Sequence, residues 1–269
     1  IKVIISYICS NYQIESNIIR NRRETLEDLP ERQLTSLPYA LDPDKNFYEY
    51  GAYQDLVTWI TEKEITEEEF EKIFKPLFGA FFSSPWAFEQ QVKFLEADGV
   101  VIPDSLKENL HRWKMYEQDI AEHIVGVLDE PEEHTSRIVQ TMYYLDEYAT
   151  DSKVVLFTNY KETFEVYEEM LADFYTEDGF SCFRRGMSAD ELEVNVCKFQ
   201  NDKNCTIMLC DESGGEGRNF QCADYVVHID LPWDANAIEQ RIGRLDRMGR
   251  ESGRPIVSVV PYAEETLEE

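Results

Sequence analysis

Short apolar runs alternate with helix-like stretches through the second half of the chain, and this alternation restricts the fold more than any other feature. The runs are Lys153–Thr158, Phe180–Phe183, Thr206–Cys210, Tyr225–Ile229 and Ile256–Val260. Apolar residues at helical spacing occupy the segments between them, Lys161–Phe174, Ser188–Phe199 and Asn236–Met248. Strands and helices that alternate in this way form a parallel sheet covered on both faces. We therefore predict a doubly wound α/β unit.

The first half of the chain has a helical pattern instead. Across residues 42–148, apolar residues recur at every third or fourth position, as in Phe70–Phe78. Thr66 followed by Glu69 predicts a capping box at the start of that helix. A weak alternation over Arg32–Leu41 allows a strand. The chain is thus expected to have a helical part followed by an α/β part.

The charge excludes broad classes of binding partner. Lys and Arg number 26 against 54 Asp and Glu, so the net charge is −28. Nucleic acids and anionic membranes repel such a chain unless its cations are concentrated in one place. Two segments do concentrate them, and they hold Arg20, Arg22 and Arg23, then Arg241, Arg244, Arg247, Arg250 and Arg254. A focused anion site therefore remains open.

Other sequence signals point to a cytoplasmic protein. No apolar run is long enough to span a membrane, and no signal peptide opens the chain. The six cysteines show no C-x-x-C spacing, which favours a reducing compartment and predicts no metal site. Both ends of the chain lie at apolar runs, so we expect it to be part of a longer protein.

A glycine-rich turn follows the predicted strand at Thr206–Cys210. Its glycines are Gly214, Gly215 and Gly217, whose backbone can approach a ligand closely and whose amides can surround an oxyanion. The turn is not a Walker A loop, because no Gly-Lys-Ser/Thr follows. A tight connection between a strand and a helix would explain the same glycines.

An arginine-rich segment covers Gln240–Arg250. On a continuous helix, Arg241, Arg244 and Arg247 would lie on one side, where guanidinium groups could bind phosphates. The alternative is a solvated helix in which Asp246 pairs with Arg250.

Together these two segments resemble the last two motifs of superfamily 2 helicases in the form of the Swi2/Snf2 ATPases. Glu216–Gln221 and Gln240–Gly249 are most similar to the bacterial RapA (HepA) branch. Val154–Asn159 and Arg185–Ser188 resemble upstream motifs, and Asn17–Arg23 resembles the basic segment that leaves the first lobe. The resemblance implies that residues 1–40 end lobe 1 and form a basic linker. Residues 41–130 would form a helical protrusion, and residues 131–269 a RecA-like C-terminal lobe.

The resemblance also implies site residues. ATP and Mg would be held mainly by the other lobe, and this chain would supply the catalytic arginines Arg244 and Arg247. The residues near the nucleotide would be Gln240, Gly215 and Gly217. Phosphates of double-stranded DNA would run along Thr158, Asn159, Gly186, Ser188, Ser213 and Gly214. Three features depart from the family: Asp211 replaces a hydroxyl, Arg250 replaces a frequent Gln, and the surface is acidic, as at Glu67–Glu71.

The function implied is part of an ATP-dependent translocase or remodeller of double-stranded DNA. The isolated chain should not hydrolyse ATP, because it lacks the phosphate loop and the metal-binding carboxylates. Its partners would be lobe 1, DNA, and a basic protein or RNA polymerase, in the nucleoid of a prokaryote or phage. Two alternatives stay open: an acidic partner-binding module without motor activity, and lobe 2 of an RNA-directed helicase.

One segment imitates a catalytic motif. Ile124–Pro131 looks like an apolar strand that ends in Asp129 and Glu130, as a Walker B pair does. We expect instead that a helix ends there and that another begins at Pro131.

Overall fold

The computed structural model describes residues 30–63, 65–148, 151–176, 178–215, 219–246, 250 and 254–268. The predicted basic segment Asn17–Arg23 and the rest of residues 1–29 lie outside the described residues, as do Gly217 and Arg247.

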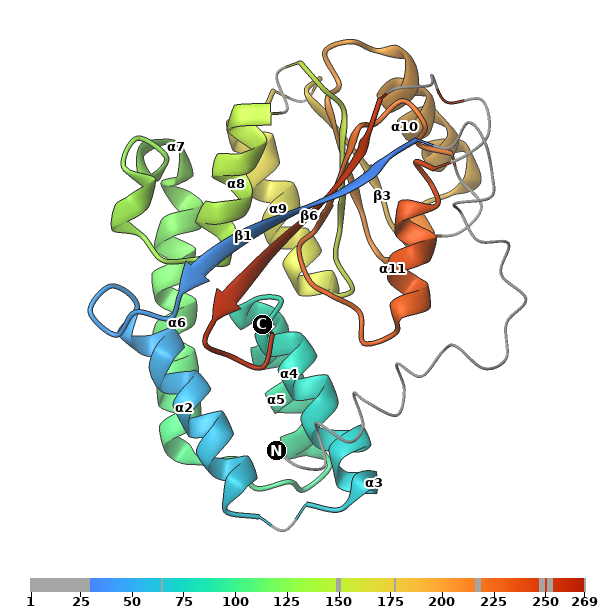
Figure 1. Cartoon of the computed structure of the whole chain (residues 1–269). Coiled ribbons are helices and arrows are strands. Elements are labelled where there is room, and N and C mark those ends of the chain that lie inside the picture. The colour runs from blue at the N-terminus through green and yellow to red at the C-terminus, as the bar shows by residue number, and fades with distance from the viewer. Residues whose placement is uncertain are drawn as a thin grey trace.

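A parallel sheet of six strands forms the centre of the α/β part, in the order β1-β6-β5-β2-β4-β3 (Figure 1). The strands are β1 (Arg32–Ala40), β2 (Val154–Phe157), β3 (Phe180–Phe183), β4 (Ile207–Cys210), β5 (Tyr225–His228) and β6 (Ile256–Glu264). The predicted doubly wound parallel sheet is confirmed.

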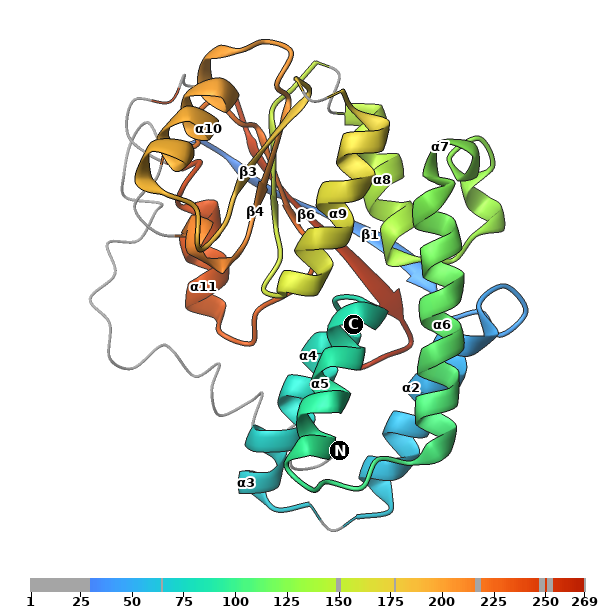
Figure 2. The same cartoon turned by 180° about the vertical axis from the view of Figure 1, so that it is seen from behind.

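Helices cover both faces of this sheet (Figures 1 and 2). One face carries α8 (Arg137–Tyr148) and α9 (Lys161–Phe174), and the other carries α10 (Ala189–Asn201) and α11 (Ala235–Ile242). The central strand β2 is apolar at every position because it is buried on both sides: Val154 and Leu156 pack into one core, Val155 and Phe157 into the other.

The edge strand β1 pairs with β6 along its whole length, from Arg32 opposite Ile256 to Ala40 opposite Glu264. Arg32 fixes the start of this strand, since its guanidinium donates to Asp246 at 2.6 and 2.9 Å and to Glu239 at 2.9 Å. Residues 32–40 therefore lie in the same sheet as the C-terminal strands. The division of the parent protein into lobes stays a prediction.

The helical part lies beyond the carboxyl ends of β1 and β6 (Figure 1). It consists of α2 (Phe47–Thr61), α3 (Glu67–Glu69), the π-helical turn η3 (Phe70–Phe74), α4 (Lys75–Phe81), α5 (Pro85–Ala97) and α6 (Asp104–Glu122). Its core is aromatic: the ring of Phe81 lies 4.9–5.7 Å from those of Tyr53, Phe88 and Trp113. In the described part of the chain, no helix could cross a membrane.

Two local predictions for this half are confirmed. Thr66 and Glu69 form the capping box at the start of α3. The segment that imitates a Walker B motif is helical, with α7 at Ile124–Val127 and the short 3-10 helix η4 at Pro131–Glu133.

A cluster of buried charges joins the helical part to the sheet. Arg137 donates to the carbonyls of Ile229 and Pro261 at 3.1 and 2.6 Å and forms an ion pair with Glu268. Glu117 faces the same region and accepts hydrogen bonds from Ser136 and, weakly, from Trp113. Burial, only partly offset by these donors and by Arg137, raises the pKa of Glu117 to about 7.

This pKa predicts a pH-dependent stability. Between the ordinary value of 4.5 and about 7, the folded state holds the proton of Glu117 while the unfolded state releases it. Stability contributed by Glu117 is therefore complete below pH 4.5 and is lost as the pH rises to about 7. Relative to Glu117→Gln, the free energy of unfolding of the wild type should fall across this window by an amount on the order of 3 kcal/mol.

Urea unfolding at a series of pH values measures this difference. Glu122→Gln, which changes an exposed carboxyl on the same helix, is the matched control. A difference between wild type and Glu117→Gln that does not change with pH would contradict the assignment.

Candidate functional site at the carboxyl edge of the sheet

The carboxyl ends of four strands bring the candidate residues to one edge of the sheet. β2 lies between β4 and β5, and β3 lies beside β4, so the loops that follow these strands are neighbours. Open α/β sheets bind ligands at this edge. The loops after β2, β3, β4 and β5 begin at Thr158, Arg184, Asp211 and Ile229.

The glycine turn lies at this edge and touches α11, whereas the residues after α11 lie toward the amino ends of β1, β5 and β6. After β4 the chain forms the 3-10 turn η5 (Glu212–Gly215), which contacts α11. Further along, the backbone N–H of Phe220 donates to the carbonyl of Arg244 at 2.9 Å. Phe220 is fully buried and packs edge to face on Phe199, which fixes this junction. Arg244 therefore lies against Phe220, in the segment that leads from the glycine turn to β5.

The arginine segment is not one continuous helix, and that prediction is wrong. α11 ends at Ile242, and tighter backbone hydrogen bonds follow, from Arg244 to Arg241 and from Leu245 to Ile242. Gly243 at this point weakens the helix. Arg241 turns into the interior and is 3% exposed, whereas Arg244 is half-buried. These two arginines do not share a helix face.

Two other residues of the segment have structural partners. Arg250 donates to the carbonyls of Gln221 and Ala223 at 2.7 and 2.5 Å and pairs with Asp224. Asp246 accepts from Arg32, so the expected pair between Asp246 and Arg250 does not form. The departure at Arg250 thus has a physical reason, because its side chain ties this segment to the loop before β5.

A cavity of about 740 Å³ lies at this edge among the loops that follow β2, β3 and β4. It includes the predicted DNA-edge residues Asn159 and Gly186, together with the cations Lys161, Arg184 and Arg185. Its remaining lining residues are Phe164, Glu165, Met187, Glu191, Asp211 and Glu212. Arg184 pairs with Glu168 and Arg185 with Glu212, so nearby carboxylates partly neutralise the cavity.

Asp211 organises the loops that line this cavity. Its carboxylate accepts the backbone N–H of Arg185 at 2.6 Å and that of Ser213 at 2.8 Å. The Ser213 hydroxyl also donates to it. Asp211 thus accepts hydrogen bonds from two backbone amides that could otherwise donate to a phosphate.

Ser188 and the two glycines have distinct local roles. Ser188 caps α10 and accepts from the N–H of Glu191, whose side chain accepts in turn from the N–H of Ser188. Gly186 adopts a φ of +94°, a conformation that favours glycine, at the open mouth of the cavity. Gly214 is buried, and a Cβ there would lie 2.7 Å from the Cβ of Cys210. The assignments of these residues to DNA stay predictions.

Thr158 and Asn159 belong to a buried polar network that the sequence did not reveal. Its centre is Asp230, which is 1% exposed. Thr158 is fully buried and donates its hydroxyl to Asp230, while Asn159 donates its backbone N–H and its side-chain amide at 2.9 and 2.7 Å. Arg241 bridges the carbonyl of Asp230 and the side-chain oxygen of Asn159 at 3.0 and 2.9 Å.

His228, which lies beside Arg241, is also excluded from solvent. Burial, and then the charge of Arg241, lower the pKa of His228 to about 3. The signal that could have revealed the network is a carboxylate directly after a buried strand, because such a group must find partners in the interior.

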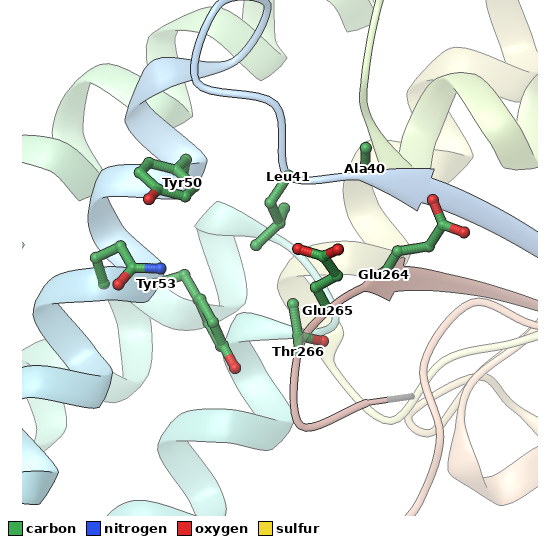
Figure 3. A pocket seen from close by; sticks show the side chains of 8 residues that line it. Ala40, Leu41, Tyr50, Tyr53, Glu264, Glu265 and Thr266 are labelled. Carbon is green, nitrogen blue, oxygen red and sulfur yellow. The ribbon is translucent and has the colours of Figure 1, made fainter.

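Two further residues predicted to lie near the nucleotide are Gln240 and Gly215. Gln240 is exposed on α11, and Gly215 ends η5. A separate cavity of about 460 Å³ lies between α2 and the ends of β1 and β6, and none of the predicted site residues lines it (Figure 3). There the side chain of Glu265 extends toward Tyr50 and Tyr53.

Comparison with known proteins agrees with this arrangement. Residues 134–249 match the helicase conserved C-terminal domain family. The C-terminal part of the Fun30 ATPase domain superposes with a TM-score of 0.58 at 14% identity, covering 89% of this chain and 87% of that one. The Sulfolobus solfataricus SWI2/SNF2 ATPase core in complex with double-stranded DNA gives 0.52 at 15%, covering 90% of this chain and 43% of that one. The fold is therefore that of RecA-like helicase C-terminal domains.

The packing of Gly214 gives a stability prediction. Gly214→Ala should destabilise the protein by about 1–3 kcal/mol, because the added methyl overlaps the buried Cys210 side chain. Gly126→Ala is the control, since a Cβ there meets nothing within 4 Å and the position is helical. Chemical denaturation measures both. Equal stability of the two variants would show that the turn is not packed as described.

Proposed function

We propose that this chain is the second RecA-like lobe of a Swi2/Snf2-type ATPase of the RapA branch, which translocates on or remodels double-stranded DNA. The observation that carries the proposal is the contact between the two segments that resemble helicase motifs: the N–H of Phe220, after the glycine turn, donates to the carbonyl of Arg244. The match of residues 134–249 to the helicase C-terminal domain supports it.

The chemistry of Arg244 suits the triphosphate of ATP. It is a half-buried guanidinium in the turn after α11, and such groups stabilise the charge that develops as a phosphoryl group leaves. Arg247 is the second proposed arginine finger, with Gln240, Gly215 and Gly217 beside the nucleotide. Among the described residues, no three His, Cys, Asp or Glu side chains gather as metal ligands. The resemblance to Swi2/Snf2 ATPases assigns the Mg ion, which would neutralise phosphate charge, mainly to the other lobe.

The cavity beside Gly186 suits a nucleic-acid backbone. Lys161, Arg184 and Arg185 are concentrated there in a chain of net charge −28. Contacts from backbone amides and cations hold phosphates without reading sequence. The solved complex of the Sulfolobus core with double-stranded DNA supports DNA as the ligand. Asp211 at the rim opposes close phosphate contact. Because Lys161, Arg184 and Arg185 would supply the phosphate contacts, binding should weaken as salt rises.

Substitution of the proposed arginine fingers tests the motor assignment. In the full-length polypeptide, with its first lobe, Arg244→Ala or Arg247→Ala should lower ATP turnover by about 10³-fold or more. Arg254→Ala is the matched control: this arginine is in the same segment, half exposed and paired with Asp224. Its loss should change turnover by no more than about twofold, as expected for a surface ion pair.

Steady-state phosphate release with saturating DNA measures these rates. Unchanged turnover in both Arg244→Ala and Arg247→Ala would refute the motor and favour the partner-binding module. Stimulation by single-stranded RNA but not by double-stranded DNA would favour the RNA-directed helicase.

The isolated chain provides a second test. Because it would depend on the other lobe for the phosphate loop and the metal, the purified 269-residue chain should neither hydrolyse ATP nor bind it tightly. Calorimetric titration and a phosphate-release assay check this expectation. Measurable hydrolysis by the isolated chain would overturn the assignment of roles between the lobes.

A further inference from the structure

The two oxygens of the Asp230 carboxylate hold different parts of the molecule. Oδ1 accepts the backbone N–H and the side-chain amide of Asn159, in the loop that borders the cavity beside Gly186. Oδ2 accepts the hydroxyl of Thr158 and that of Ser83, which lies between α4 and α5 of the helical part. One buried group therefore fixes the loop after β2 against the helical part.

Arg241 extends this connection to the arginine turn. Its guanidinium reaches the carbonyl of Asp230 and the side-chain oxygen of Asn159, and it stacks over the ring of Phe157 at 5.2 Å. Its own carbonyl accepts the backbone N–H of Arg244 at 3.1 Å. Arg241 therefore contacts the side chain of Asn159 at one end and the backbone of Arg244 at the other.

The burial of this arrangement favours a positioning role. Arg241 and Asp230 are 3% and 1% exposed, and their closest charged atoms are 3.8 Å apart. A buried ion pair is a poor source of stability, because both groups lose their hydration. The planar guanidinium of Arg241, however, holds two acceptors at fixed angles, which an ammonium group cannot do.

We propose that Arg241 and Asp230 are positioning residues that make the placement of Arg244 depend on DNA bound at the Asn159 loop, so that DNA stimulates ATP turnover. This inference rests on the proposed function. DNA at the cavity would hold the Asn159 loop in one position, and the bridge through Arg241 would hold the arginine turn in the geometry that serves the nucleotide. Such coupling between two sites has a measurable size.

Arg241→Lys tests the bridge while keeping the positive charge beside Asp230. In the full-length polypeptide, the ratio of DNA-stimulated to DNA-independent ATP turnover should fall at least about tenfold. The DNA concentration that gives half-maximal stimulation should change by less than about threefold, because Arg241 is buried and makes no contact with phosphates. A lost DNA contact would instead raise that concentration and leave the maximum intact.

Arg250→Lys is the matched control. Arg250 is also a buried arginine of this segment that bridges backbone carbonyls and a carboxylate, but its partners are Gln221, Ala223 and Asp224. Its replacement should lower thermal stability and leave the stimulation ratio within about twofold. If Arg241→Lys fails to fold, Asn159→Ala removes the other end of the bridge from a half-buried site and should lower the maximal stimulation in the same way.

The outcomes separate this inference from the proposed function. A stimulation ratio that is unchanged in Arg241→Lys, or reduced equally in Arg241→Lys and Arg250→Lys, overturns the coupling role. A wild type that DNA does not stimulate also overturns it. Loss of turnover in Arg244→Ala together with any of these results would leave the arginine-finger assignment standing.

Discussion

The buried carboxylate of Asp230 is the constraint on which the arrangement of the site depends. An ionised group in the interior is tolerated only with partners for its oxygens, and here the donors come from elements that are distant in sequence. Ser83 comes from the helical part, and Thr158 and Asn159 come from the loop after β2. Arg241 of α11 donates instead to the backbone carbonyl of Asp230, and its guanidinium lies 3.8 Å from the carboxylate. The position of Asp230 thus relates the helical part, the loop after β2 and the arginine turn to one another.

A chain this acidic uses its arginines in several ways. Arg32 and Arg250 hold β1 and the loop before β5 in place, and Arg241 is committed to the buried network. Arg244 is half-buried in the turn after α11, where its carbonyl accepts the backbone N–H of Phe220. The acidic surface disfavours anion binding over most of the molecule.

The sequence predicted those parts of the fold that local chemistry decides. The apolar runs gave the strands, because β2 and β4 are buried on both faces. The capping box at Thr66 was predicted correctly, because it needs only the side chains of neighbouring residues. For the site, the sequence predicted the neighbouring glycine and arginine segments, which the structure brings together.

Features that depend on distant partners could not be predicted. Helical periodicity placed Arg241 and Arg244 on one face, yet Arg241 turns inward because Asp230 and Asn159 lie beneath α11. Asp246 pairs with Arg32, more than 200 residues away, rather than with its neighbour Arg250. The role of Asp230 in the buried network could not be predicted, because a single carboxylate after a strand belongs to no recognisable motif.

The most direct test of the account is a structure of the full-length protein bound to ADP, Mg and a fluoride mimic of the transferred phosphoryl group. The account predicts that the Arg244 guanidinium of this chain lies within hydrogen-bond distance of the mimic, with the Asp230–Arg241–Asn159 bridge intact. Arg244 turned away from the nucleotide and paired with carboxylates of its own lobe in that structure would contradict it.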